Sequence, residues 1–181
     1  MKVEETSLPG VLVITPRIFN DSRGSFWETW NVKSFTEAGL PSTWVQDNFS
    51  LSKKSVLRGL HYQTIQPQGK LVRVTHGAVL DVAVDLRRGS PTFAKHVAVE
   101  LTGENGKMLW IPEGFGHGFL VLSDVAGFAY KVTDSYCPAG ERTIVWNDPD
   151  LAIAWPIASD AAIVSDKDRQ GATLQNAEVF A

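Results

Sequence analysis

Cysteine is almost absent from this chain: Cys137 is the only one among 181 residues, so no intrachain disulfide can form. The chain also lacks an excess of positive charge, because its formal net charge is −3, and this removes any general attraction for nucleic acid or anionic membranes. No apolar run approaches the length of a membrane span, and the N-terminus has no signal-peptide pattern. We therefore expect a cytoplasmic protein that binds no nucleic acid and no membrane, and whose phosphate sites are built from locally placed cations.

Helix signals are few, and β-strand patterns fill most of the chain. Residues 79–86 and 96–101 alternate their side chains with a period of two, as half-buried strands do. We expect a short helix at residues 31–38, ended by a glycine, and another helical turn after Ser165. Turn-forming sequences separate further β-rich runs at residues 10–14, 25–30, 44–50, 69–75, 118–122, 127–133 and 143–146. Many short strands in a chain of this length predict a single all-β domain, residues 1–181, built as a sandwich or barrel.

The segment with the most chemical information runs from Arg58 to Lys70. His61 lies on an expected strand, three residues after Arg58 and nine before Lys70. Imidazole can accept a proton near neutral pH, arginine holds phosphate with two parallel hydrogen bonds, and lysine can stabilise an oxygen that becomes negative. This combination suggests proton abstraction from a phosphorylated substrate. A lone histidine on a strand is more often only a satisfied polar residue, so the inference depends on its neighbours.

Strand parity raises a question about the same segment. His61 and Gln63 share one face of an ideal strand, whereas Arg58 points to the other face. If Arg58 and His61 serve one pocket, the strand must bulge or bend, and Gly59 is the residue that permits it. Otherwise Arg58 serves a different wall or a neighbouring subunit. The sequence leaves both arrangements open.

A metal site is the main rival explanation for His61. Double-stranded β-helix proteins often bind a metal through His-x-His, a glutamate shortly afterwards and a distant histidine. Here Gln63 replaces the second histidine, and no glutamate lies between His61 and Arg87. Because a hard or borderline metal needs three or more good ligands, we expect no metal.

Other segments carry side chains suited to the same chemistry. His117 lies between glycines, which we expect to expose its ring. Tyr130 is a phenol that could return a proton as a general acid, and Tyr136 could stack on a base ring. One carboxylate of residues 165–168 could orient an imidazole, and the amides of residues 46–48 could read a nucleobase edge. Taken alone, each of these also fits an ordinary surface or half-buried residue.

These segments belong to a longer set of motifs that runs in order across nearly the whole chain. The set comprises Asp21-x-Arg23-Gly24-x-Phe26, Gln46-Asp47-Asn48, Leu57-Arg58-Gly59-Leu60-His61, Gly69-Lys70-Leu71-Val72-Arg73, Asp81-Val82-Ala83-Val84-Asp85, Ser90-Pro91-Thr92-Phe93, Trp110-Ile111-Pro112-Glu113-Gly114-Phe115, His117-Gly118-Phe119, Tyr130-Lys131, Trp146-Asn147-Asp148-Pro149 and Ser165-x-Lys167-Asp168. A set of this size is far more specific than any one of its members. With it, the chain resembles the dTDP-4-dehydrorhamnose 3,5-epimerase family.

The resemblance implies a jelly-roll, double-stranded β-helix core of the cupin type with a few short helices. It also implies homodimers in which strands are shared between subunits, and no metal or organic cofactor. The implied reaction converts dTDP-4-dehydro-6-deoxy-D-glucose into dTDP-4-dehydro-L-rhamnose, by removing and returning protons at the two carbons that flank the keto group. This step belongs to dTDP-L-rhamnose biosynthesis, which supplies polysaccharide synthesis.

The resemblance also assigns roles to individual residues. His61 is expected to be the general base, oriented by Asp168, and Tyr130 the general acid on the opposite side of the sugar. Lys70 and His117 are expected near the keto oxygen and its enolate. The residues that it places at the rest of the substrate are Arg23 and Arg58 at the diphosphate, Glu28, Gln46, Asp47 and Asn48 at the thymidine, and Glu141 and Lys167 at further contacts. Tyr136, whose ring could stack on a base, is a further expected substrate contact that the resemblance does not assign.

Three alternatives stay open at this point. Related enzymes of other deoxysugar pathways invert only the 3- or only the 5-carbon, through details of pocket shape that a sequence does not reveal. A metal-dependent cupin enzyme, such as an oxygenase, would share the fold, and so would a non-catalytic module that binds a sugar nucleotide or carbohydrate. The presence of His61, Tyr130 and Asp168 together favours double epimerisation.

Overall fold

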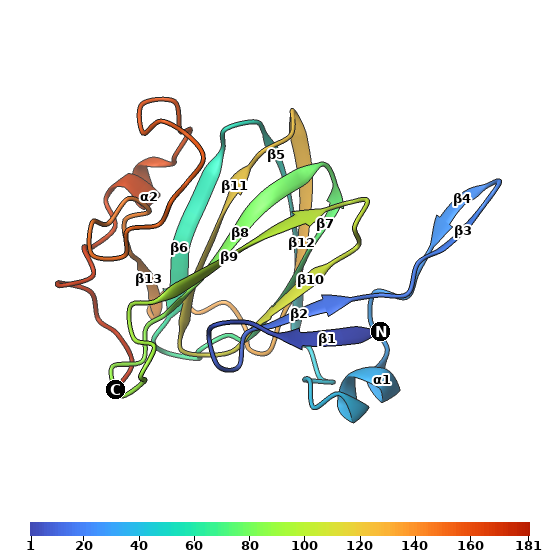
Figure 1. Cartoon of the computed structure of the whole chain (residues 1–181). Helices are drawn as coiled ribbons and strands as arrows, with labels where there is room; N and C mark the ends of the chain where they lie inside the picture. The colour runs from blue at the N-terminus through green and yellow to red at the C-terminus, as the bar shows by residue number, and fades with distance from the viewer.

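Two antiparallel β-sheets face each other in this protein, whose residues 1–181 are all described by a computed structural model (Figure 1). The six strands of the first sheet are, in order, β1 (Lys2–Glu5), β2 (Leu12–Thr15), β10 (Met108–Ile111), β7 (Lys70–His76), β12 (Val125–Val132) and β5 (Gln46–Lys53). The five strands of the second sheet are β13 (Glu141–Thr143), β6 (Leu57–Gln63), β11 (Phe115–Val121), β8 (Ala78–Asp85) and β9 (His96–Thr102).

The order of the strands explains the fold class. From β5 to β8, and again from β9 to β13, the chain alternates between the two sheets at every step. This winding is that of a double-stranded β-helix, and it makes strands that are distant in sequence into neighbours within each sheet. The prediction of an all-β, jelly-roll fold of the cupin type with a few short helices is therefore confirmed.

Apolar side chains fill part of the space between the sheets. Val72 and Val74 of β7 are buried against residues of the facing sheet, including Phe119 of β11. Phe119 stacks on Phe128 of β12, with ring centroids 4.1 Å apart. These two rings also line the cavity described below, so the apolar core ends where the polar site begins.

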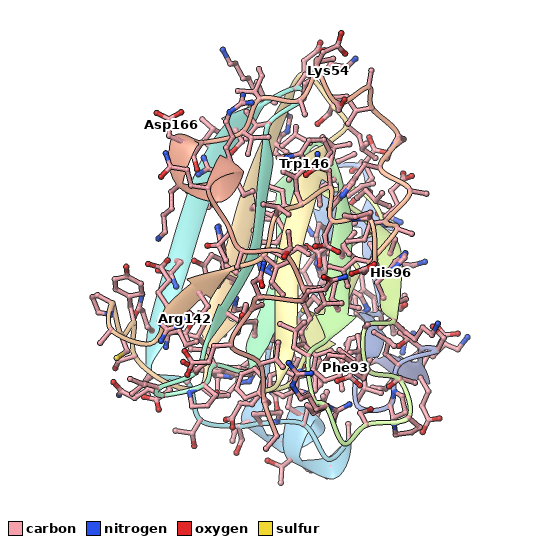
Figure 2. The ribbon with its side chains drawn as sticks, turned by 90° about the vertical axis from the view of Figure 1, so that its left-hand side faces the viewer. Lys54, Phe93, His96, Arg142, Trp146 and Asp166 are labelled. Atoms are coloured by element: carbon pink, nitrogen blue, oxygen red, sulfur yellow. The ribbon has the colours of Figure 1, made fainter.

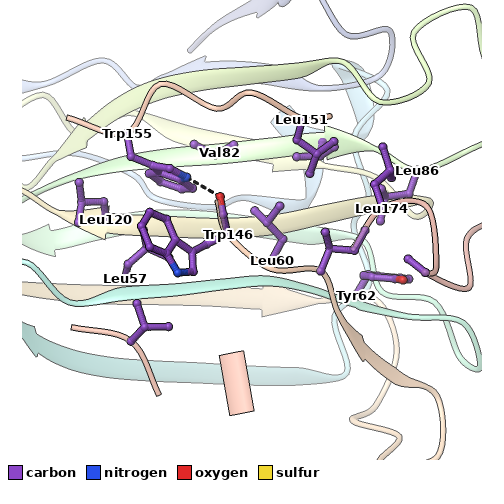
Figure 3. Close-up of a cluster of buried hydrophobic side chains, with 14 of the residues drawn as sticks. Leu57, Leu60, Tyr62, Val82, Leu86, Leu120, Trp146, Leu151, Trp155 and Leu174 are labelled. Carbon is purple, nitrogen blue, oxygen red and sulfur yellow. Dashed lines mark hydrogen bonds between the residues drawn. The ribbon is translucent and has the colours of Figure 1, made fainter. Parts of the chain in front are cut away.

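The C-terminal segment covers the outer face of the five-stranded sheet. Trp146, Trp155 and Leu174 pack there in one buried cluster with Leu57 and Leu120 of the sheet, and the Trp155 Nε1–H donates to the Trp146 carbonyl oxygen at 2.8 Å (Figure 3). Helix α2 (Asp166–Arg169) lies in this segment, on the side of the molecule that Figure 2 turns to the viewer. Because this apolar cover fixes the segment against β6, it also fixes α2 beside β6.

Two short elements lie outside the sheets. Strands β3 (Phe19–Asp21) and β4 (Gly24–Phe26) form a hairpin that projects away from the body of the molecule (Figure 1). Helix α1 (Val32–Glu37) begins after Asn31, whose side-chain oxygen accepts from two backbone N–H groups of the first turn. Both predicted helices are confirmed. Neither has the length and apolar character that crossing a bilayer requires.

Several strand predictions differ from the structure. The strand expected at residues 25–30 ends at Phe26, and Trp30 packs on Phe35 of α1 and pairs with no strand. The strand expected at residues 143–146 is Glu141–Thr143. Strands β1, β3 and β10 were not predicted; all four residues of β10 are buried, so it shows none of the alternation that marks a half-buried strand.

Candidate active site

A cavity of about 300 Å³ opens between the two sheets and gathers many of the polar side chains that the sequence singles out. Its five-stranded wall carries Arg58 and His61 of β6 and His117 of β11. Its six-stranded wall carries Lys70 of β7 and Tyr130 of β12. Groups from two facing sheets therefore converge on one space.

A bulge in β6 brings Arg58 and His61 to the same cavity. His61 lies opposite His117 and Arg58 lies opposite Phe119, so three steps along β6 correspond to two along β11. Gly59 lies within the bulge with φ of 115°, and a Cβ at this position would come within 2.6 Å of the His117 carbonyl oxygen. Only glycine fits there. Of the two arrangements that strand parity left open, the structure has the bulge at Gly59.

His61 is paired with Asp168. The His61 Nε2 atom lies 2.6 Å from Asp168 Oδ1, and the histidine side chain is 34% exposed whereas that of Asp168 is 5% exposed. The imidazole is thus held on one side and accessible on the other. A histidine in this position can take a proton from a molecule in the cavity, while the carboxylate fixes its tautomer and stabilises the cation that forms.

Local structure aims the Asp168 carboxylate at His61. Ser165 caps helix α2 and its Oγ accepts from the Asp168 backbone N–H. The second carboxylate oxygen accepts from the Gly59 backbone N–H at 3.3 Å. Burial raises the pKa of Asp168, but the hydrogen bond and charge of His61, with the Gly59 N–H and the Ser165 side chain, hold it below its usual value. Asp168 is therefore an anion at neutral pH.

Lys70 is a buried cation at the cavity wall. Its Nζ donates to the His61 carbonyl oxygen at 3.2 Å, and the residue is 8% exposed. Burial lowers the pKa of Lys70 to about 8, against the opposing charges of Asp81 and Glu141. Below that pH the ammonium is charged and shielded from bulk solvent, and a cation of this kind can stabilise a developing negative oxygen.

His117 forms a second histidine–aspartate pair, with Asp81 of β8. Its Nε2 lies 2.9 Å from Asp81 Oδ2, and both residues are buried. The flanking glycines were expected to expose this ring, and that expectation is wrong: a Cβ on Gly118 would come within 2.6 Å of the Arg58 carbonyl oxygen, so the glycine allows close packing of strands. Burial lowers the pKa of His117, more than the charge of Asp81 raises it. A neutral ring with its Nε2–H on Asp81 keeps no proton on Nδ1.

Tyr130 faces the cavity from the sheet opposite His61. It lies on β12, next to Asn48 of β5 and Val72 of β7 in the sheet. Burial raises the pKa of its phenol above the usual value, although the charge of Arg58 opposes this. The phenol is therefore protonated at neutral pH and available as a proton donor.

The mouth of the cavity is lined by a hydrogen-bonded group from three segments. Glu141 of β13 accepts from the Tyr136 hydroxyl at 2.8 Å and forms an ion pair with Lys167 of α2. Burial raises the pKa of Glu141, but these two partners hold it below its usual value. Tyr136 and Glu141 line the cavity, whereas Lys167 does not line it and pairs with Glu141.

Polar groups of β5 hold cavity residues in two places along the strand. Ser52, which is 5% exposed, accepts from the Arg58 Nε and Nη2 groups at 3.2 and 3.1 Å. Gln46 donates to Asn48 at 2.8 Å, and its side-chain oxygen accepts from the Tyr136 backbone N–H at 3.1 Å. Asn48 lines the cavity, and Gln46 reaches it through Asn48 and Tyr136.

Gln46 and Lys167 thus contact residues of the cavity without lining it, and three further residues predicted to bind substrate lie away from the cavity of their own chain. Arg23 is on the projecting hairpin, 88% exposed and paired with Asp21. Glu28 accepts from Asn31 beside α1. Asp47 is on the outer face of β5, paired with Lys131. The parity of β5 explains the last case, because Asp47 points away from the face that Gln46 and Asn48 share.

No group of three or more histidine, cysteine, aspartate or glutamate side chains is arranged to hold a metal ion. Gln63, the residue at the second position of the His-x-His pattern, bonds to backbone groups instead. The expectation of a metal-free reaction stays a prediction.

Comparison with known proteins assigns the family. The family model described as dTDP-4-dehydrorhamnose 3,5-epimerase matches residues 5–176. The chain belongs to the dTDP-4-dehydrorhamnose 3,5-epimerase family. A member of this family from Pseudomonas aeruginosa, named dTDP-4-dehydrorhamnose 3,5-epimerase, is 55% identical over 181 residues and covers 99% of both chains.

Solved structures of the family agree with the fold. The dTDP-6-deoxy-D-glucose-3,5-epimerase from Legionella pneumophila, in complex with dTDP-4-keto-L-rhamnose, is 49% identical with a TM-score of 0.94, covering 98% of this chain and 94% of that chain. A 3'-monoepimerase from Streptomyces bikiniensis, in complex with dTDP-quinovose, is 37% identical with a TM-score of 0.87, covering 94% of this chain and 86% of that chain. The family predicted from the motifs is confirmed.

Three residues shape the site although no role in it was predicted for them: Ser52, Gln63 and Asp81. Asp81 carried a signal, because it is an acidic residue within an alternating apolar strand, and such a residue is buried only with a partner. Ser52 and Gln63 carried none, since their partners come from a bulged strand and from loops distant in sequence.

Proposed function

We propose that this family member is a dTDP-4-dehydrorhamnose 3,5-epimerase, an isomerase that converts dTDP-4-dehydro-6-deoxy-D-glucose into dTDP-4-dehydro-L-rhamnose in dTDP-L-rhamnose biosynthesis. The observation that carries the proposal is the pairing of His61 with Asp168 on one wall of the cavity, with Tyr130 on the facing wall. A base and an acid on opposite sides of one sugar ring are what inversion of a carbon centre requires.

His61 takes the proton from carbon. Protons on a carbon beside a ketone are weakly acidic, because the electron pair left behind moves onto the keto oxygen as an enolate. The accessible ring of His61 receives the proton, and the buried carboxylate of Asp168 stabilises the imidazolium. The 4-keto sugar has such a carbon on each side, so the same base serves positions 3 and 5 in turn.

Lys70 stabilises the enolate. Its ammonium is fixed at the cavity wall by the His61 carbonyl oxygen and is charged below its pKa of about 8. A preorganised cation in a dry site is well suited to charge that develops in the transition state. His117 is buried and neutral, so we assign it to shaping this pocket next to Lys70 and consider it secondary as an oxyanion donor.

Tyr130 returns a proton from the other face. Its phenol donates to the carbanionic carbon of the enolate, which inverts the centre. Because each inversion uses one proton of Tyr130 and places one on His61, solvent must reprotonate the tyrosinate and deprotonate the imidazolium before the second carbon reacts. The nearby charge of Arg58 favours the transient tyrosinate.

The nucleotide occupies the mouth of the cavity in this proposal. Arg58, held by Ser52, binds the diphosphate. Tyr136 stacks on the thymine ring, Asn48 reads its polar edge, and Glu141 contacts the substrate with Lys167 behind it. These roles follow the assignments made from the motifs.

We also propose a homodimer. Support comes from apolar side chains that a lone chain leaves in water: Phe26 and Phe19 on the hairpin are 73% and 51% exposed, and Leu51 and Phe49 on the outer face of β5 are 65% and 63% exposed. Large apolar side chains gathered on a surface mark contacts with another protein. A cytoplasmic location stays a prediction.

In a dimer, Arg23 and Glu28 could contact substrate bound in the cavity of the partner subunit. Both lie on or beside the projecting hairpin and outside the cavity of their own chain, so we propose that each hairpin completes the partner's cavity. Mixing Arg23→Ala with His61→Asn tests this, because a mixed dimer regains one site with both native residues. Activity of the mixture well above the sum of the two variants' separate activities supports the proposal, and activity no higher than that sum argues that each site is built from one chain.

Solvent exchange tests the reaction. The protein is incubated with dTDP-4-dehydro-6-deoxy-D-glucose in deuterated water, and the sugar is examined by NMR. We expect deuterium and inversion at both carbons 3 and 5. Label at one carbon only would instead identify a mono-epimerase, the activity named for the Streptomyces bikiniensis relative, and binding without label would leave only a sugar-nucleotide-binding module.

A further inference from the structure

The side-chain amide of Gln63 joins two loops at the mouth of the cavity. Gln63 ends β6, two residues after His61, and is 4% exposed. Its Nε2 donates to the carbonyl oxygens of Gln66 and Ser135 at 2.7 and 3.2 Å, and its Oε1 accepts from the Cys137 backbone N–H at 2.9 Å. Both amide hydrogens and the oxygen are therefore used by backbone groups.

Two of these three bonds flank Tyr136. Ser135 precedes it and Cys137 follows it, so Gln63 holds the backbone on both sides of this residue. The segment between β12 and β13 that carries Tyr136 belongs to neither strand. Tyr136 is itself 51% exposed, so packing does little to fix it. Hydrogen bonds from side chains must therefore set its position.

We propose that Gln63 is a positioning residue for substrate binding: it presents Tyr136 to the nucleotide and takes no part in proton transfer. The inference rests on the proposed function only in assigning a nucleotide to Tyr136. An amide suits the position because it supplies two donors and an acceptor at one point, whereas a carboxylate offers no donor and a neutral imidazole only one. Gln63 therefore occupies the position of a metal-binding histidine in other cupins and here holds two loops by hydrogen bonds.

A neutral substitution isolates this effect. Gln63→Met keeps the length of the side chain, removes all three hydrogen bonds and adds no charge near the diphosphate. We expect the Kd for dTDP and the KM for the sugar nucleotide to rise about fivefold to tenfold, as for the loss of one or two hydrogen bonds. We expect kcat to change less than about threefold, because His61 and Asp168 keep their pairing. The matched control is Gln175→Met, which removes an exposed amide remote from the cavity and should leave both values unchanged.

A double-mutant cycle shows whether the effect passes through Tyr136. If it does, Gln63→Met should change the Kd for dTDP less than about twofold in a Tyr136→Ala background. Equal fold-changes in the two backgrounds would overturn the proposal, as would a lower kcat with unchanged KM or an unchanged Kd for dTDP. Wild-type protein that epimerises normally in the same assays keeps a failure of this inference distinct from a failure of the proposed function.

Amide hydrogen exchange offers a test that needs no variant. The Cys137 N–H should be protected in the native protein because Gln63 accepts from it. Exchange of that amide at the rate of an unstructured peptide would contradict the arrangement, whatever the folding behaviour of Gln63→Met.

Discussion

The two histidine–aspartate pairs of the cavity have the same chemistry and different surroundings. His61 is 34% exposed at its side chain and meets an aspartate from α2, which is distant in sequence, whereas His117 is 9% exposed and meets an aspartate of the neighbouring strand. Access to the cavity lets the first ring exchange protons with a substrate. Burial lowers the pKa of His117, which favours its neutral form, and we propose that its contact with Asp81 is structural. We therefore propose that access to solvent and substrate, and not the pairing with aspartate, makes His61 the base.

Removing the carboxylate from each pair is the strongest way to separate them. Asp168→Asn should lower kcat about a thousandfold, since the amide favours the wrong tautomer of His61 and cannot stabilise its cation. Asp81→Asn should lower kcat by about tenfold or less. Steady-state kinetics on both variants, with thermal unfolding as a control, checks the difference. Equal losses would mean that the two pairs act alike.

Lys70→Ala should lower kcat about a hundredfold to a thousandfold, because the enolate loses its only charged donor on this wall. Lys131→Ala is a matched control, since that lysine is on the outer face of the sheet and pairs with Asp47. If His117 is instead the main oxyanion donor, His117→Asn will match or exceed the loss from Lys70→Ala, and the comparison of the two pairs will need revision.

Tyr130→Phe should reduce inversion more than deuterium exchange, by about tenfold or more. His61 can still remove and return a proton on its own face when the phenol is absent. NMR of the sugar in deuterated water separates label with retained configuration from label with inversion. A parallel decrease of both signals would argue that Tyr130 is not the acid.

The pH dependence should show the titration of Lys70. The charged form is the active one, so kcat/KM should fall as the pH rises through about 8, by about tenfold per unit beyond it. In Lys70→Arg this alkaline limb should move above pH 10, even though the activity is lower, because guanidinium stays charged. An alkaline limb that is unchanged in Lys70→Arg belongs to another group.

Much of this site could be predicted from local patterns and motifs, and the remainder could not. The alternation at residues 79–86 predicted strand β8. The segment from Arg58 to Lys70 predicted the charged and basic groups that line the cavity. Only the family resemblance predicted that Asp168 pairs with His61. The two residues are 107 positions apart in the sequence, and the buried tryptophan cluster that brings them together leaves no local pattern. The predicted exposure of His117 was wrong because a glycine in a sequence can mark either a turn or a close contact between strands.

Deuterium exchange by metal-stripped protein, beside His61→Asn at the same concentration, tests the central claim most directly. The account predicts full labelling of carbons 3 and 5 by the chelator-treated wild type, and no labelling by His61→Asn although that variant still binds dTDP. Normal labelling by His61→Asn, or a wild type that needs added metal to label its substrate, would contradict it.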